Sequence, residues 1–143
     1  MLPAILALLF FVCSCTRNNG NIGKQFGQWK VTSITVNGKE DSAYTGNMFW
    51  SFQSSTVEMK TVSENHETVT TFGNYRIMDD TLFITFPDED RPPLPGLGLK
   101  QYAENAIQIV KLSGSQMVLA YNTDSWDADE GIAANVILQL TKW

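Results

Sequence analysis

Carboxylates are the side chains whose number and spacing in this sequence could do chemistry. Four of them fall within seven residues near the C-terminus: Asp124, Asp127, Asp129 and Glu130. Asp127 and Asp129 have the alternating spacing at which oxygen ligands hold calcium. However, the following Gly131 is not at the position that an EF-hand loop requires, and no bidentate glutamate ends the segment. We therefore expect a solvated acidic turn here and no calcium site.

The remaining titratable side chains do not form a catalytic pattern. His66 is the only histidine, and the sequence around it predicts a hairpin turn. A zinc site needs further histidines or cysteines near it, and a catalytic triad cannot be argued from one turn histidine. Asp88 and Asp90 lie in an expected loop with no partner that would make them a catalytic pair. The sequence thus predicts no catalytic residue, no metal site, no cofactor and no enzymatic activity.

Composition narrows the class of protein further. The chain has 143 residues, 43% of them hydrophobic, which predicts a single folded domain. Its net charge is -5, and its basic residues are scattered singly. A nucleic-acid partner is therefore not expected, because neutralising phosphates needs a basic face. Cys13 and Cys15 are the only cysteines, so the rest of the chain has no disulfide available to it.

The N-terminus carries an apolar run that ends at a cysteine. Residues 1–12 (MLPAILALLFFV) contain no charge and are too few to cross a bilayer as a helix, but they match the apolar region of a signal peptide. The following Val12-Cys13-Ser14-Cys15 resembles the lipobox of bacterial lipoproteins, in which an apolar residue, a small residue and the modified cysteine occupy the places of Val12, Ser14 and Cys15.

This resemblance implies where the protein resides. It implies that residues 1–14 are a signal peptide, that Cys15 carries the lipid, and that residues 15–23 form a polar tether. The expected location is the bacterial cell envelope, with the membrane as a partner through the lipid. No acidic export tag follows Cys15, which favours the periplasm-facing side of the outer membrane over the cell surface.

From residue 24 to residue 143, apolar and polar residues alternate with period two, which is typical of β-strands with one buried face. Turn residues separate eight such segments, and an acidic loop lies between the last two. No segment has the length and periodicity of a helix. Eight strands joined in sequence predict an all-β, antiparallel up-and-down barrel, with a two-sheet sandwich as the alternative. The expected strands are 28–37, 47–53, 56–62, 67–78, 81–86, 105–112, 116–122 and 135–143.

The first of these segments contains Gly27-Gln28-Trp29, a Gly-x-Trp at the start of an eight-stranded body. In this the chain resembles the lipocalin-like domain of small bacterial lipoproteins. The resemblance implies that Gly27 lets the chain enter the barrel floor and that Trp29 plugs the closed end. It also implies that a basic residue of the last strand, here Lys142, lies over the indole.

A barrel of eight strands is wide enough either to be filled by its own side chains or to hold one small ligand. A ligand-binding barrel would be lined by the large residues of the inner faces and would take a small apolar molecule. Residues 87–104 would then act as a lid. The alternative is a filled barrel that serves as a scaffold or binds a protein partner, with Trp126 and Trp143 as contact residues. The expected lining residues are Trp50, Phe52, Met59, Tyr75 and Phe86.

Overall fold

The computed structural model describes residues 23–127 and 132–143, and all regular secondary structure in these ranges is β. The expected signal peptide, Cys15, nearly all of the expected tether and Asp129 lie outside the described residues. Within the described ranges there is no helix long and apolar enough to span a membrane.

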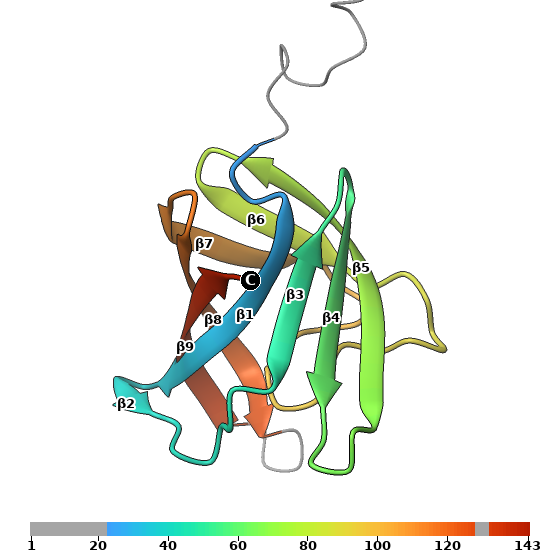
Figure 1. The fold of residues 1–143 in the computed structure, drawn as a ribbon, viewed down its shortest axis with the longest axis vertical. Helices are drawn as coiled ribbons and strands as arrows, with labels where there is room; N and C mark the ends of the chain where they lie inside the picture. Colours follow the sequence, from blue (N-terminus) through green and yellow to red (C-terminus); the bar gives the residue numbers. More distant parts are fainter. Residues whose placement is uncertain (1–22, 128–131) are drawn as a thin grey trace, which may run out of the picture.

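The strands form one antiparallel sheet that closes on itself (Figure 1). β1 pairs with β3, each strand from β3 to β8 pairs with the next along the chain, and β1 also pairs with β9, which closes the barrel. The two-residue β2 only extends the turn after β1. The expected eight-stranded up-and-down barrel is therefore confirmed, and a two-sheet sandwich is excluded. The strands are β1 (Gly27–Val36), β2 (Lys39–Glu40), β3 (Met48–Phe52), β4 (Thr56–Val62), β5 (Thr68–Met78), β6 (Thr81–Thr85), β7 (Asn105–Leu112), β8 (Gln116–Asp127) and β9 (Ile132–Lys142).

Alternation of side chains builds the core. Along β3, Met48, Trp50 and Phe52 are buried while the residues between them are partly exposed, as the two faces of a pleated strand require. The buried residues of the described chain are almost all apolar, and they form a single cluster inside the barrel. This period-two burial is the physical reason that the strands could be located from the sequence.

The predicted ends of the last two strands were wrong. β8 continues to Asp127 and β9 starts at Ile132, because pairing persists through Thr123 and Ala134 and resumes after a register shift at Asp127 and Ile132. Most of the expected acidic loop is therefore strand.

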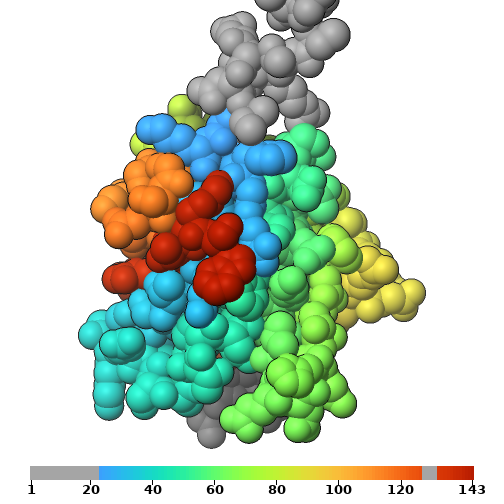
Figure 2. All heavy atoms as spheres, viewed as in Figure 1, coloured from blue at the N-terminus to red at the C-terminus, as the bar shows by residue number. Residues whose placement is uncertain are grey.

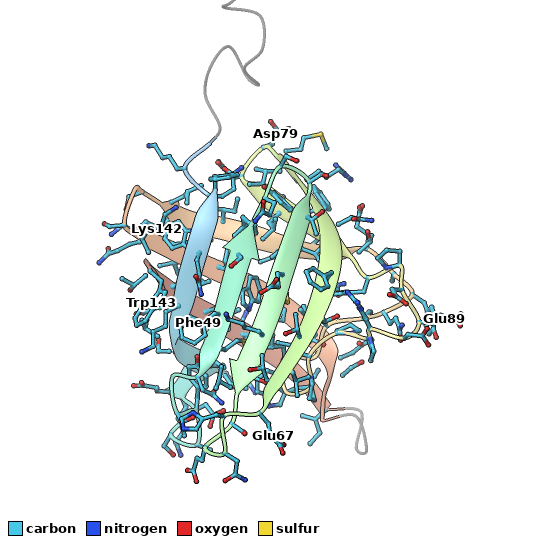
Figure 3. All side chains as sticks on the ribbon, turned by 45° about the vertical axis from the view of Figure 1, so that its right-hand side comes forward. Phe49, Glu67, Asp79, Glu89, Lys142 and Trp143 are labelled. Atoms are coloured by element: carbon cyan, nitrogen blue, oxygen red, sulfur yellow. The ribbon has the colours of Figure 1, made fainter. Side chains whose placement is uncertain are left out.

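One wall of the barrel is short. The ladder between β6 and β7 ends at Ile84 and Asn105, whereas β5 and β8 both extend further. The 87–104 loop connects β6 to β7 and occupies this part of the wall. Figure 3 shows Glu89 of this loop projecting at the side of the barrel, between the end marked by Asp79 and the opposite end marked by Glu67. We refer to the Asp79 end as the floor and to the Glu67 end as the mouth.

Candidate ligand-binding site

Trp29 lies near the start of β1, at the floor end of the barrel. Its side chain is completely buried, and its indole Nε1 donates a hydrogen bond to the carbonyl of Gln25, 2.8 Å away. Gln25 belongs to the short segment that leads into β1, so this bond fixes the incoming chain across the floor. The indole therefore has both its apolar surface and its polar atom satisfied within the protein.

Lys142 of β9 lies directly opposite Trp29 in the ladder. Its Nζ is 4.7 Å from the centre of the indole ring and also donates a hydrogen bond to the carbonyl of Phe26. Gly27 has φ +109, and a Cβ at this position would lie 2.9 Å from Lys142 Nζ. The structure thus brings Gly27, Trp29 and Lys142 together, because only glycine leaves room for the ammonium group at this backbone angle.

The five expected lining residues all lie in the barrel interior. Trp50 and Phe52 come from β3, Met59 from β4 and Tyr75 from β5, while Phe86 follows β6. Tyr75 donates its hydroxyl proton to the carbonyl of Gln53 and packs edge-on against Phe52, with the ring centres 5.1 Å apart. These residues pack in one apolar cluster with the rest of the core, so their own side chains fill this part of the interior.

The 87–104 loop completes this filling from the mouth. Leu94 and Leu97 are 3% and 0% exposed and belong to the same apolar cluster as the strand residues. They are core residues supplied by a loop rather than by a strand. The interior is thus closed off by the 87–104 loop, which is not one of the paired strands of the barrel wall.

Three hydroxyl groups on the barrel wall hold the loop in this position. Thr71 of β5 donates to the carbonyl of Arg91 at 2.9 Å. Tyr121 and Thr123 of β8 donate to the carbonyls of Leu97 and Gly98, both at 2.6 Å. A hydrogen bond of this kind contributes about 0.5–1.5 kcal/mol. The loop is therefore held by side-chain contacts that can break without opening the ladder between strands.

Two glycines turn Leu97 inward. Gly96 and Gly98 have φ values of +88 and +67, angles that side chains rarely adopt. A Cβ on Gly96 would meet nothing within 4 Å, whereas a Cβ on Gly98 would lie 2.8 Å from Thr123 Oγ1. Gly98 is thus required both by its backbone angle and by the close approach of β8.

Burial and surface ion pairs determine the electrostatics around the loop. Burial raises the pKa of Tyr121 far above its ordinary value, so its hydroxyl remains a donor to Leu97. The hydroxyl of Ser125, followed by Lys100, lowers the pKa of the exposed Asp124 carboxyl. Lys100 Nζ lies 3.4 Å from Asp124, which links the end of the loop to β8 at the surface.

Comparison with known proteins identifies the family. A family model described as a lipocalin-like domain matches residues 8–127, which is most of the chain. The chain belongs to the lipocalin-like domain family. Among proteins of curated function, none is similar to it in sequence.

Solved structures share the lipocalin-like fold at low sequence identity. A lipocalin-like protein from Bacteroides uniformis is 18% identical, with a TM-score of 0.65 over 85% of this chain and 100% of that one. A protein from Bacteroides eggerthii is 18% identical, with a TM-score of 0.64 over 83% and 99% of the two chains. Bovine odorant-binding protein, solved with its natural ligand, is 17% identical, with a TM-score of 0.50 over 86% and 74%. These likenesses show the fold alone.

The lipocalin-like barrel also has a cleft on the outer side of its loop. The cleft has a volume of about 430 Å³ and lies between the 87–104 loop and the end of β8, where Ser125 and Trp126 line it. Leu94 lines the cleft and also belongs to the core, so the cleft and the interior are separated by this part of the loop. Trp126 was expected alone in an acidic loop, but it lies in β8 and packs against the core.

Trp143 lies on the outer surface of the lipocalin-like barrel and is 68% exposed. Its ring contacts Phe49, with the centres 5.4 Å apart, and Lys30 Nζ lies 5.1 Å from the indole. On the other side, Lys60 Nζ lies 5.7 Å from the ring of Phe49. Figure 3 shows Phe49 and Trp143 as neighbours, and Figure 2 shows the C-terminal residues in red beside β1 in blue. We call Lys30, Phe49, Lys60 and Trp143 the outer patch.

The other residues with possible chemistry do not assemble into a site. His66 has φ +61 and lies exposed in the turn between β4 and β5. In residues 23–127 and 132–143, no three His, Cys, Asp or Glu side chains come together as metal ligands do.

The sequence analysis missed five residues that matter for the mouth: Leu94, Leu97, Thr71, Tyr121 and Thr123. A signal for the leucines was present in Pro93-Leu94-Pro95-Gly96-Leu97-Gly98, where apolar residues alternate with glycine and proline inside a loop. Nothing in the sequence pairs the three hydroxyls with loop carbonyls, because these contacts join residues that are 20 to 25 positions apart.

Proposed function

We propose that this protein is a lipid-anchored binding protein of the bacterial cell envelope that takes a small apolar molecule into its barrel. The observation that carries the proposal is the position of the 87–104 loop, which fills part of the barrel interior. Leu94 and Leu97 occupy the apolar interior from a loop, where a strand would otherwise close the wall. A ligand that displaces them finds an apolar site, and small-molecule sites favour the mouths of β-barrels.

Opening at this loop is the least costly route to the interior. Separating two strands would break several consecutive main-chain hydrogen bonds, whereas lifting the loop breaks three hydroxyl–carbonyl bonds and surface ion pairs and withdraws Leu94 and Leu97 from the core, but leaves the ladder between strands intact. Segments with few ladder bonds are those that open locally in folded proteins. The outer cleft at Leu94 and Trp126 gives an incoming molecule a first contact with the loop.

Lipocalin-like barrels are in general binding proteins and not enzymes, which supports this proposal. The test is titration with the fluorescent apolar probe N-phenyl-1-naphthylamine. We expect saturable binding that Trp126→Ala changes by less than about twofold, because the interior site does not include Trp126. Loss of binding in Trp126→Ala places the probe in the outer cleft, and no binding at all contradicts the proposal.

The anchor rests on Val12, Ser14 and Cys15. A diacylglycerol on Cys15 binds membranes at about 0.8 kcal/mol for each buried CH₂ group, so two or three chains hold the protein firmly. Because Gly23 leads into β1 at the floor, an anchor at Cys15 would direct the mouth away from the membrane. Cys15→Ser should move the protein from the membrane to the soluble periplasmic fraction; persistence in the membrane fraction would contradict the anchor.

A second candidate function is partner binding through the outer patch. An exposed tryptophan beside a half-buried phenylalanine, both flanked by lysines on an acidic protein, is complementary to an acidic protein surface. If this is the function, reversing the charges of Lys30 and Lys60 to glutamate should weaken a cross-linked envelope complex while leaving probe binding unchanged. Equal yields of the complex in wild type and variant would exclude this role.

A further inference from the structure

Trp50 has an indole N–H without a partner inside the barrel. The side chain is 0% exposed, and its Nε1 is the one buried side-chain nitrogen or oxygen of the described residues that lacks a hydrogen bond. The neighbouring Trp29 has its indole N–H bonded to the carbonyl of Gln25. Buried polar groups in native proteins nearly always have partners, so an orphaned donor needs an explanation.

The other polar groups of the interior are already used. Thr71, Tyr121 and Thr123 hold the loop, and Tyr75 donates to the carbonyl of Gln53. Trp50 is therefore the donor that remains for a molecule entering the barrel. An indole nitrogen donates and does not accept, so a molecule that forms a hydrogen bond with Trp50 must offer an acceptor.

Trp50 shares the inner face of the barrel with a residue that holds the loop. It lies opposite Met59 on the next strand, and Met59 lies opposite Thr71, which binds the loop. These residues share the inner face, so two strand spacings of about 4.8 Å separate Trp50 from the seat of the loop. Leu94 and Leu97 belong to the same apolar cluster as Trp50, so a molecule that takes their place enters the interior that holds the indole.

The interior also limits the charge of its ligand. No charged side chain is buried among the described residues, and the buried polar ones are Thr71 and Thr123. An anion or a cation drawn into this interior would lose its hydration and find no counter-charge.

We infer that the barrel selects an uncharged, mainly apolar molecule with one hydrogen-bond acceptor oxygen, which Trp50 Nε1 binds. This inference rests on the proposed function, because it requires a ligand inside the barrel. It assigns Trp50 a role in specificity, whereas the other lining residues contribute shape and apolar surface.

The test compares three probes that share a benzene ring. Acetophenone carries a neutral acceptor, isopropylbenzene replaces that oxygen with a methyl group, and benzoate carries a negative charge. In the full chain with Cys13→Ser and Cys15→Ser, we expect acetophenone and isopropylbenzene to bind and benzoate not to bind. Trp50→Phe should weaken acetophenone about tenfold and change isopropylbenzene by less than about twofold, because only acetophenone loses a hydrogen bond. Trp143→Phe, a matched control on the outer surface of the barrel, should change neither.

Nuclear magnetic resonance of the indole N–H groups tests the same inference in the protein that retains Trp50, so the result does not depend on how Trp50→Phe folds. Acetophenone should move the Trp50 Nε1–H resonance downfield, whereas isopropylbenzene should not, and the Trp29 resonance should stay in place because its N–H is already bonded. If both neutral probes bind but Trp50→Phe affects them equally and the resonance does not move, the inference is wrong and the proposed function stands. If neither neutral probe binds to the wild type, both are wrong. Binding of benzoate as tight as that of acetophenone overturns the selection for uncharged ligands.

Discussion

Gly98→Ala tests whether the 87–104 loop is seated as described, and Gly96→Ala is its matched control. Both glycines have positive φ, so alanine at either position carries a backbone cost of about 1–2 kcal/mol. Only at Gly98 does the new Cβ collide, at 2.7 Å from Thr123 Cγ2 and 2.8 Å from Thr123 Oγ1.

Relief of this collision requires Thr123 to rotate or the loop to lift. Either movement breaks the bond from Thr123 to the carbonyl of Gly98, which is worth about 0.5–1.5 kcal/mol. Leu97, the adjacent residue, then loses part of its burial, which is worth about 1.5–3 kcal/mol when complete. We therefore expect Gly98→Ala to lower the free energy of unfolding by about 1–3 kcal/mol more than Gly96→Ala does.

Urea denaturation followed by tryptophan fluorescence measures the difference. The same two variants are then titrated with N-phenyl-1-naphthylamine. We expect the Gly98→Ala protein to bind this probe more tightly than the Gly96→Ala protein, because its loosened loop leaves a larger fraction of the molecules open before binding. Equal free energies of unfolding and equal probe affinities in the two variants would refute the seating of Leu97 by Gly98 and Thr123.

Three further predictions follow from the floor and the mouth. Trp29→Ala should lower the free energy of unfolding by about 3–5 kcal/mol, and a loss below about 1 kcal/mol in urea denaturation would show that Trp29 does not plug the floor. Lys142→Met should lose the cation–π contact, worth about 0.5–2 kcal/mol in the same assay, together with the hydrogen bond to the carbonyl of Phe26, and only the cation–π part of the cost should vanish when Trp29 is already alanine. Tyr121→Phe should cost about 1–2 kcal/mol at neutral pH and should reduce the loss of stability in alkali. The raised pKa of Tyr121 stabilises the fold fully below about pH 10, the usual value for tyrosine, and this contribution is lost as the pH rises above it; an unchanged pH dependence in the variant would contradict the buried donor role.

The strands were predictable because each has one buried face, and a period of two is then visible in the residues themselves. Met48, Trp50 and Phe52 show this pattern plainly within the expected strand 47–53, and all three are buried. The end of β8 was not predictable in this way. Asp124 and Trp126 read as an acidic turn, yet pairing with β9 carries the strand through them.

The seat of the loop could not be predicted, since it depends on contacts between distant residues. Leu94 and Leu97 lie in a segment rich in proline and glycine, where no period identifies an inward face. The β6–β7 ladder is short, and Leu94 and Leu97 fill the gap that it leaves. The length of this ladder is set by where strand pairing stops in the folded structure. The orphaned Nε1 of Trp50 is a property of packing and has no counterpart in the sequence.

The central claim is that the interior opens at the 87–104 loop, and a reversible cross-link tests it most directly. A Cβ on Gly98 would lie 3.2 Å from Thr123 Cβ, close to the 3.5–4.5 Å typical of a disulfide. In a chain with Cys13→Ser and Cys15→Ser, the pair Gly98→Cys and Thr123→Cys should bind N-phenyl-1-naphthylamine when reduced and lose at least about tenfold in affinity when oxidised, while each single cysteine variant is indifferent to oxidation. Equal affinity in the oxidised and reduced forms would show that the ligand does not enter beneath this loop.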